Sequence, residues 1–333
     1  MLNWYLQNGK DSDVVINSSV SLSRNFKDIP FTTKFSKEQA QKIKDTIKEV
    51  TPSLGYGLKY IDLSDLDNVT KLSLVEKGII SPEFSINKQG AMLINEEENI
   101  CITINEEDHI KIQVFSSGLE LENLKNLAVE IDEKIAEILP YATSKKYGYL
   151  TVYPTNVGTA MKACVTLHLT ALALTGNNAK ILNIINDFGM NIYSKNTQDD
   201  IYKISNKQTL GITEEEIIKK LNVITEKVIE QERIARKYLA KNSIGLEDRV
   251  YRAYGTLTYA KKISSNELKK LLSYVKLGTD LGIIKELNDT KVSKLYLYTQ
   301  PANLQKHFGE QLDVYEVEVK RPEIISKIIN DNI

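Results

Sequence analysis

The sequence predicts an α+β fold, in which strands gather in the middle of the chain and helices lie outside them. Two observations favour this class. Short segments between residues 91 and 205 alternate apolar and polar side chains, which is the period of a strand. On either side of them, apolar residues recur every three or four positions, the period of a helix. This order favours α+β over a doubly wound parallel sheet.

The spacing of apolar residues and the residues that begin or end helices predict each element along the chain. The first helix is expected over residues 36–50, because Ser36 and Gln39 form a capping box and Pro52 follows the end. The elements expected next are strands at 91–95, 100–105 and 110–115, a helix from Leu121 to Ile138, a strand at 148–153, a turn at 154–159, a helix to about 173, and strands at 190–193 and 201–205.

The last third of the sequence is expected to be mostly helical. Thr213 and Glu216 form a second capping box, which opens a long helix to about residue 241. Helices follow from Leu246 onward, with one possible strand near 295–297. These patterns predict two domains, a mixed domain over 1–240 and a helical domain over 241–333.

Composition excludes several classes of protein. The 333 residues hold 43 basic and 44 acidic side chains, so no charge excess favours nucleic acid or an anionic membrane. There is no apolar run long enough to span a bilayer, and the start lacks the pattern of a secretory signal, so we expect a cytoplasmic protein. Two cysteines and three histidines are too few for a disulfide framework or a typical zinc site, and no metal site is expected.

Several short motifs occur in a fixed order along the chain. They are Asn105-Glu106-Glu107-Asp108-His109, Gly148-Tyr149-Leu150-Thr151, Pro154-Thr155-Asn156-Val157-Gly158-Thr159, Ile204-Ser205-Asn206, Glu247-Asp248-Arg249-Val250-Tyr251-Arg252, Leu277-Gly278 and Gln300-Pro301-Ala302. In this order they resemble the ATP:guanido phosphotransferases, and among them the bacterial protein-arginine kinases.

The resemblance implies a fold and a chemistry. The family fold is an antiparallel sheet flanked by helices, followed here by a helical C-terminal domain. Family members transfer the γ-phosphoryl group of Mg-ATP to a guanidinium. A fan of arginines grips the phosphates, and carboxylates orient and deprotonate the guanidinium, which suits a reaction catalysed by positioning and charge neutralisation.

The resemblance also assigns positions in this sequence. Glu107 matches the family's base, although by itself an acidic residue in a strand turn would be read as a solvated hairpin tip. The nucleotide positions include Ser18, Ala163 and Val165, which match the family. At five further nucleotide positions the expected residue is replaced: Ser19 and Ser21 stand for arginines, Gly78 for a histidine, and Lys111 and Lys162 for arginines.

Two further family features are missing or incomplete. The segment from Phe188 to Ile204 is too short for the family's Arg-Gly-x-Tyr-Gly-Glu-Gly loop, and residues 193–200 read as a plain hairpin turn in which Asp199 or Asp200 could replace the lost glutamate. Of the C-terminal motif that reads phosphoarginine, only Arg321 matches. Cys164 and His168, at i and i+4 of the helix expected there, are read as packing residues rather than as a metal pair.

Two hypotheses follow. In the first, the chain is a pseudokinase that regulates or scaffolds Clp-linked protein quality control and binds Mg-ATP weakly. The partners that the resemblance implies are a second copy in a homodimer, a zinc-finger activator, the Clp unfoldase–protease, a heat-shock repressor and an active paralogue. In the second, the chain is a divergent but active protein-arginine kinase that uses Lys111, Lys162 and Glu107.

Overall fold

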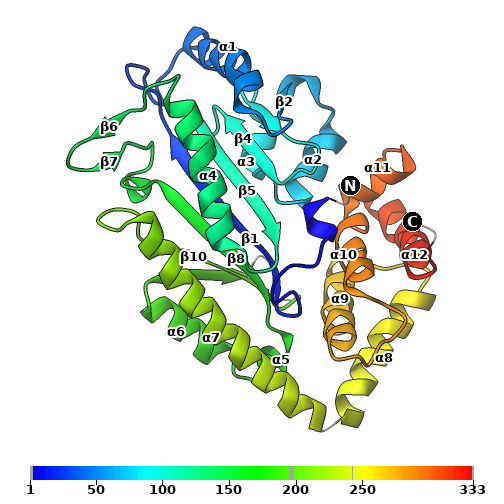
Figure 1. Ribbon diagram of the computed structural model, residues 1–333. Helices are drawn as coiled ribbons and strands as arrows, with labels where there is room; N and C mark the ends of the chain where they lie inside the picture. Colours follow the sequence, from blue (N-terminus) through cyan, green and yellow to red (C-terminus); the bar gives the residue numbers. More distant parts are fainter. Residues whose placement is uncertain (1–2, 195–198, 242, 332–333) are drawn as a thin grey trace.

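The computed structural model describes residues 3–194, 199–241 and 243–331 (Figure 1). Its main feature is an eight-stranded sheet in which all neighbouring strands are antiparallel. In spatial order the strands are β2 (Lys59–Asp62), β3 (Ala91–Ile94), β4 (Ile100–Ile104), β5 (Ile110–Ser117), β1 (Val15–Arg24), β8 (Met161–His168), β10 (Ile201–Asn206) and β9 (Met190–Ser194). The α+β prediction is confirmed.

Helices cover one face of this sheet along its length and the other face only at its β3–β4 end, and they form the C-terminal third of the chain (Figure 1). Those before residue 242 are α1 (Lys37–Leu54), α2 (Asn68–Glu76), α3 (Pro82–Ser85), α4 (Leu121–Ala136), α5 (Thr170–Leu174), α6 (Asn178–Asp187) and α7 (Glu214–Lys241). The later ones are α8 (Ser243–Tyr259), α9 (Ser265–Asp280), α10 (Asp289–Tyr298), α11 (Pro301–Phe308) and α12 (Val314–Ile329). A two-stranded hairpin joins β6 (Thr143–Ser144) to β7 (Gly148–Tyr149).

The two faces of the sheet differ because side chains alternate along each strand. Val20 and Leu22 of β1, with Ala163 and Val165 of β8, are buried in the core under α4 and α7. On the opposite face, the residues between them on β1 and β8 are mostly polar and half-buried, whereas Cys101 and Thr103 of β4 are fully buried there. We call this second surface of β5, β1, β8 and β10 the open face.

The capping boxes form as the sequence predicts. Ser36 Oγ accepts a hydrogen bond from the Gln39 amide, and the Gln39 side chain accepts one from the Ser36 amide. Thr213 and Glu216 exchange the same pair of bonds at the start of α7. The first helix nevertheless continues through Pro52 to Leu54, where the sequence predicts an earlier end. A proline removes only one hydrogen bond at that point, and the buried Leu54 holds the final turn against the core.

Two predicted elements are wrong in type. The segment after Gly158 is the strand β8 rather than a helix, because it pairs with β1 on one side and β10 on the other. Its apolar residues at 161, 163, 165 and 167 recur with the period of a strand. Residues 295–297 lie inside α10, which Asn288 caps and which buries Leu295 and Leu297. The strand expected at 148–153 shrinks to Gly148–Tyr149.

Helices α8 to α12 share a second core around Val250, Leu272 and Ile324. At Gly278 of α9 a Cβ atom would lie 2.3 Å from Cγ1 of Val250 in α8, so glycine permits these helices to approach closely. The change from the first core to the second falls at the junction of α7 and α8. The domain boundary near residue 240 stays a prediction.

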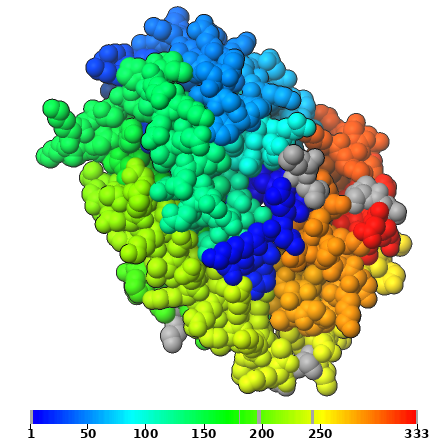
Figure 2. Space-filling model, viewed as in Figure 1, coloured from blue at the N-terminus to red at the C-terminus, as the bar shows by residue number. Residues whose placement is uncertain are grey.

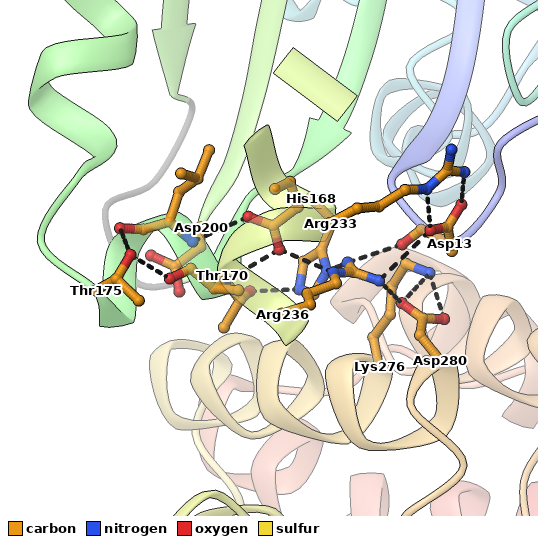
Figure 3. A network of polar contacts seen from close by, with 12 residues as sticks. Asp13, His168, Thr170, Thr175, Asp200, Arg233, Arg236, Lys276 and Asp280 are labelled. Carbon is orange, nitrogen blue, oxygen red and sulfur yellow. Dashed lines mark hydrogen bonds and ion pairs between the residues drawn. The ribbon is translucent and has the colours of Figure 1, made fainter. Parts of the chain in front are cut away.

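A buried polar network lies where α7 and α9 meet the N-terminal segment (Figure 3). Arg236 donates hydrogen bonds to Glu232, Asp280 and the carbonyl of Asp13, at 2.9, 3.1 and 2.9 Å. Lys276 pairs with the Asp280 carboxylate at 3.1 Å and donates to the carbonyl of Ser12. In Figure 2 the N-terminal segment accordingly lies against the C-terminal helices.

Candidate functional site

The open face gathers four of the positions that the resemblance assigns to nucleotide binding. Ser19 and Ser21 lie on β1 at the centre of the sheet. Ser21 pairs in register with Lys162 of β8, and its hydroxyl donates to the Lys162 carbonyl at 3.3 Å. Lys111 of β5 pairs with Ser23, one step further along the same face. Four side chains that the sequence places up to 143 positions apart therefore share one surface.

Both lysines of this set already have partners. Lys162 Nζ donates to the carbonyl of Asn206 at 2.9 Å. Burial lowers the pKa of Lys162, and the nearby charge of Lys203 acts in the same direction. Lys111 Nζ lies 3.7 Å from the Glu106 carboxylate, which also accepts hydrogen bonds from Thr103 and Ser81. Each ammonium group carries three N–H donors, so one protein partner leaves donors free, but neither lysine has the planar fork of an arginine.

Glu107 lies in the turn between β4 and β5. Its carboxylate has no hydrogen-bond or ion-pair partner among the described residues, and the residue is exposed to solvent. Burial raises the pKa of Glu107, while the charge of Lys111 opposes this rise. The backbone is fixed by Thr32, whose hydroxyl donates to the Glu107 carbonyl.

The two residues after Glu107 shape the turn, as the sequence suggests. Asp108 Oδ1 accepts hydrogen bonds from the Asn25 side chain at 2.6 Å and from the Val152 amide at 2.8 Å. His109 Nδ1 accepts from the Phe26 amide, and its Nε2 lies 2.8 Å from the Pro30 carbonyl. Both side chains are buried, so the turn that carries Glu107 is rigidly supported.

Other assigned residues do not join this surface with their side chains. Ser18 points to the helix-covered face, where its hydroxyl donates to the Gly118 carbonyl at 2.8 Å. Ala163 and Val165 lie in the main core. Gly78 follows α2 with a φ of +74°, and the next residue, Ile79, accepts a bond from Gln113 of the open face. Gly78 therefore lies beside the open face but offers it no side chain.

The segment that replaces the family loop is described only in part, since residues 195–198 lie outside the described residues. Asp199 Oδ1 accepts a bond from the Ile201 amide. Asp200 Oδ2 lies 3.5 Å from the Ser273 hydroxyl of α9, and burial raises the pKa of Asp200 to about 6 (Figure 3). Asp200 thus faces the C-terminal helices, which does not favour it as a substitute for the guanidinium-binding glutamate.

The retained arginines serve the fold. Arg321 is fully buried, and its guanidinium donates to the carbonyls of Thr299 and Ile263 and to the Ser265 hydroxyl. Arg24 is also buried, with two of its nitrogens 3.0 and 2.7 Å from Asp132 Oδ2. Each guanidinium is enclosed by protein oxygens, so neither is available to a phosphoryl group.

Cys164 and His168 lie on a strand and not on a helix, contrary to the sequence prediction. His168 Nε2 lies 2.6 Å from the Thr170 hydroxyl and 3.1 Å from that of Ser273. Over the described ranges, no group of three or more His, Cys, Asp or Glu side chains is placed to hold a metal ion. The sequence analysis did not single out Lys203, whose side chain also lies on the open face. The alternation of side chains along the strand at 201–205 is the only sequence feature that would have placed it there.

Comparison with known proteins shows which family the chain resembles over its whole length. The family described as "ATP:guanido phosphotransferase, C-terminal catalytic domain" matches residues 38–235, and "Protein-arginine kinase McsB C-terminal domain" matches residues 243–332. A protein-arginine kinase of Halothermothrix orenii is 40% identical over 98% of this chain and 96% of its own. One of Bacillus pumilus is 42% identical over 97% of this chain and 92% of its own.

Solved structures show the same fold at low sequence identity. The duplicated taurocyamine kinase of Schistosoma mansoni superposes with a TM-score of 0.61 at 21% identity, over 70% of this chain and 35% of that one. Lombricine kinase gives 0.59 at 19% identity, over 68% of each chain. In the part of the chain that the structure describes, no helix has the length and apolar character needed to cross a membrane.

Proposed function

The chain belongs to the protein-arginine kinases of the ATP:guanido phosphotransferase family, and we propose on that premise that it has lost catalysis and acts as a regulatory or scaffold protein. The observation that carries this proposal is that no arginine stands at the four assigned nucleotide positions of the open face, two of which are neutral serines. Ser19 and Ser21 offer hydroxyls, and Lys111 and Lys162 are engaged by protein oxygens. One arginine at a phosphoryl-transfer transition state is worth about 10³–10⁵ in rate.

Mg-ATP is the cofactor that the family implies, and the residues present fit it poorly. A triphosphate needs several cationic donors that are not already paired. Each charge-assisted hydrogen bond contributes roughly 1.5–3 kcal/mol, so two serines in place of arginines remove most of a micromolar affinity. Lysine also lacks the planar fork with which arginine binds two phosphate oxygens.

A second candidate function is an active but divergent protein-arginine kinase. One observation favours it: the exposed Glu107 carboxylate is unpaired among the described residues, and its raised pKa suits a group that accepts a proton. The names of the relatives fit this reading as well. In it, Lys111 and Lys162 would release their present partners to bind the nucleotide, and Glu107 would hold and deprotonate the substrate guanidinium.

Calorimetry with Mg-ADP separates the two functions. The proposal expects a dissociation constant above about 1 mM, because the serines supply no charged donor to the phosphates. Incubation with Mg-ATP and casein should leave no phosphoarginine detectable by mass spectrometry. The matched control is Lys162→Ala, which should change neither result. Micromolar binding that Lys162→Ala abolishes, or phosphoarginine that Glu107→Gln abolishes, would instead establish the active kinase.

The partners proposed for this role follow from the family. They are a second copy of the chain through residues beyond 240, a zinc-finger activator, the Clp unfoldase–protease, a heat-shock repressor and an active paralogue, all in the cytoplasm. A second, arginine-complete copy in the same genome supports the scaffold role. A sole copy beside an activator gene supports the active kinase.

A further inference from the structure

An apolar groove is lined by residues of α5, α6 and α7. Figure 1 shows these three helices next to one another. The volume of the groove is about 1430 Å³. The floor is formed by buried residues of the main core, among them Leu172, Ile185 and Val228. The groove belongs to the helix-covered side of the sheet, since α7 packs on β8 and β10 there. It is therefore separate from the open face, which carries the residues assigned to nucleotide binding.

The walls of the groove expose large apolar side chains to solvent. On α6 and just after it, Ile184 is 40% exposed and Phe188 is 59% exposed. On α7, Val223, Ile234 and Tyr238 are 44, 52 and 68% exposed. Single exposed apolar residues are common on protein surfaces, but a contiguous set that lines one concavity marks a binding surface.

The charges on the rim are predominantly positive. Lys219, Lys220 and Lys227 line the groove, and none of them forms an ion pair within the described residues. Two carboxylates, Glu216 and Glu230, also line the groove, so the three lysines leave a small positive excess. The groove is thus complementary to an occupant that combines apolar and acidic groups.

The dimensions favour a helix over a small molecule. The lining residues of α7 run from Glu216 to Leu239, which at 1.5 Å per residue is a stripe of about 35 Å. The volume exceeds the roughly 300–1,000 Å³ of small-molecule sites. A trough between two helices, lined at the spacing of helical turns, is the geometry that accepts an amphipathic helix.

We propose that the groove between α6 and α7 binds an amphipathic helix of a partner protein, with the apolar stripe of that helix on the groove floor and acidic side chains beside Lys219, Lys220 and Lys227. The concave shape argues against a flat lipid surface, which would reach the rim but not the floor. The proposal holds whether or not the open face catalyses phosphoryl transfer.

The probe is a fluorescent 18-residue synthetic helix with leucines along one face and glutamates on both flanks. Two control peptides carry the same leucines flanked by lysines, or the same composition in scrambled order. Fluorescence anisotropy with the full chain should show binding of the acidic helix, and each control should bind at least about tenfold more weakly. Failure of the acidic helix to bind, or equal binding of the lysine-flanked helix, overturns the proposal.

Variants locate the binding. Ile234→Glu in the groove should weaken binding at least about tenfold, whereas Ile86→Glu, at an apolar residue 80% exposed elsewhere, should not change it. Tyr238→Ser serves as a second groove variant if circular dichroism shows that Ile234→Glu is misfolded. Lys219→Glu with Lys227→Glu should also weaken binding, unlike Lys37→Glu with Lys42→Glu on α1.

One further outcome would point to a different partner. Vesicles of phosphatidylglycerol are offered to the wild type and to Ile234→Glu in a flotation assay. The proposal expects that neither protein floats with the vesicles. Flotation of the wild type that is lost in Ile234→Glu, and that the acidic helix does not compete, would assign the groove to a membrane and overturn the proposal. Groove variants that bind the acidic helix as the wild type does would also overturn it.

Discussion

Ser19 and Ser21 lie on the central strand β1, where Ser21 pairs in register with Lys162 and Lys111 pairs with Ser23. A serine side chain is short and neutral, and the Ser21 hydroxyl is already satisfied because it donates to the Lys162 carbonyl. An arginine at either position would restore a cation, but the other charged groups that the family uses would still be missing. The missing loop between β9 and β10 would have to supply a further arginine and a carboxylate.

At this residue scale we predict that Ser19→Arg combined with Ser21→Arg does not produce a protein-arginine kinase. Nucleotide affinity should rise by about 1.5–3 kcal/mol for each arginine that reaches a phosphate, because each is a charge-assisted donor. Phosphoarginine on casein, measured by mass spectrometry, should stay at background. The single variants serve as controls for affinity. Clear activity of the double variant would mean that the shortened loop is dispensable.

A second prediction at this scale concerns Asp200. Burial raises its pKa to about 6, so between pH 4 and 6 the folded chain keeps a proton that the unfolded chain releases. Rising pH therefore favours unfolding over this window, and Asp200→Asn should remove the effect. We expect the variant to be more stable than the wild type by about 1 kcal/mol at pH 7.5, after allowance for partial exposure, and no more stable at pH 4.

Urea denaturation at the two pH values measures this difference. Asn tolerates the positive φ of 51° at this position, so the substitution adds no backbone strain. Asp187→Asn, near the exposed end of α6, is the matched control and should show no such pH dependence. Equal stability of wild type and Asp200→Asn at pH 7.5 would contradict the prediction.

At the scale of elements, the packing of α8 against α9 depends on the short distance between Gly278 and Val250. A Cβ at Gly278 would lie 2.3 Å from Val250 Cγ1, so Gly278→Ala should destabilise the chain by about 1–3 kcal/mol through overpacking. Val250→Ala in the same chain should recover part of the loss. Gly255→Ala is the control: no neighbouring atom lies within 4 Å of its Cβ, and the change should stabilise α8 by up to about 1 kcal/mol.

Thermal denaturation of the four variants tests this packing. The changes in unfolding free energy of Gly278→Ala and Val250→Ala should not add in the double variant, because the two residues are in contact. If Gly278→Ala is as stable as the wild type, α8 and α9 do not approach as described. If Val250→Ala and Gly278→Ala simply add, the close approach of these two residues does not carry the effect.

The elements also show what the sequence could and could not predict. Helices with capping boxes, such as those beginning at Lys37 and Glu214, were predictable because the signal is local. The strand β8 was missed because a short apolar run fits either a helix or a strand, and its pairing with β1 and β10, far away in the sequence, decides between them. The candidate site was assigned from motifs, but the pairing of Lys111 with Glu106 required coordinates.

At the scale of the whole molecule, the homodimer that the resemblance implies is expected to form through residues beyond 240, where large apolar side chains are exposed. Val314 and Tyr315, at the start of α12, are 78 and 63% exposed. We predict that the full chain is a dimer by light scattering, and that Val314→Glu with Tyr315→Glu makes it monomeric at low micromolar concentration because two charges then enter the interface. Ile86→Glu should leave the dimer intact. A monomeric wild type would contradict the prediction.

The central position of β1 has a consequence for how the chain folds as it is synthesised. The first strand to leave the ribosome pairs with β5 and β8, and the adjoining Ser12 carbonyl accepts a bond from Lys276. At about 5–20 residues per second, these partners emerge up to about a minute after the strand itself. During that interval β1 is an unpaired strand with one apolar face, so we expect the nascent N-terminus to need protection from aggregation until the later strands emerge.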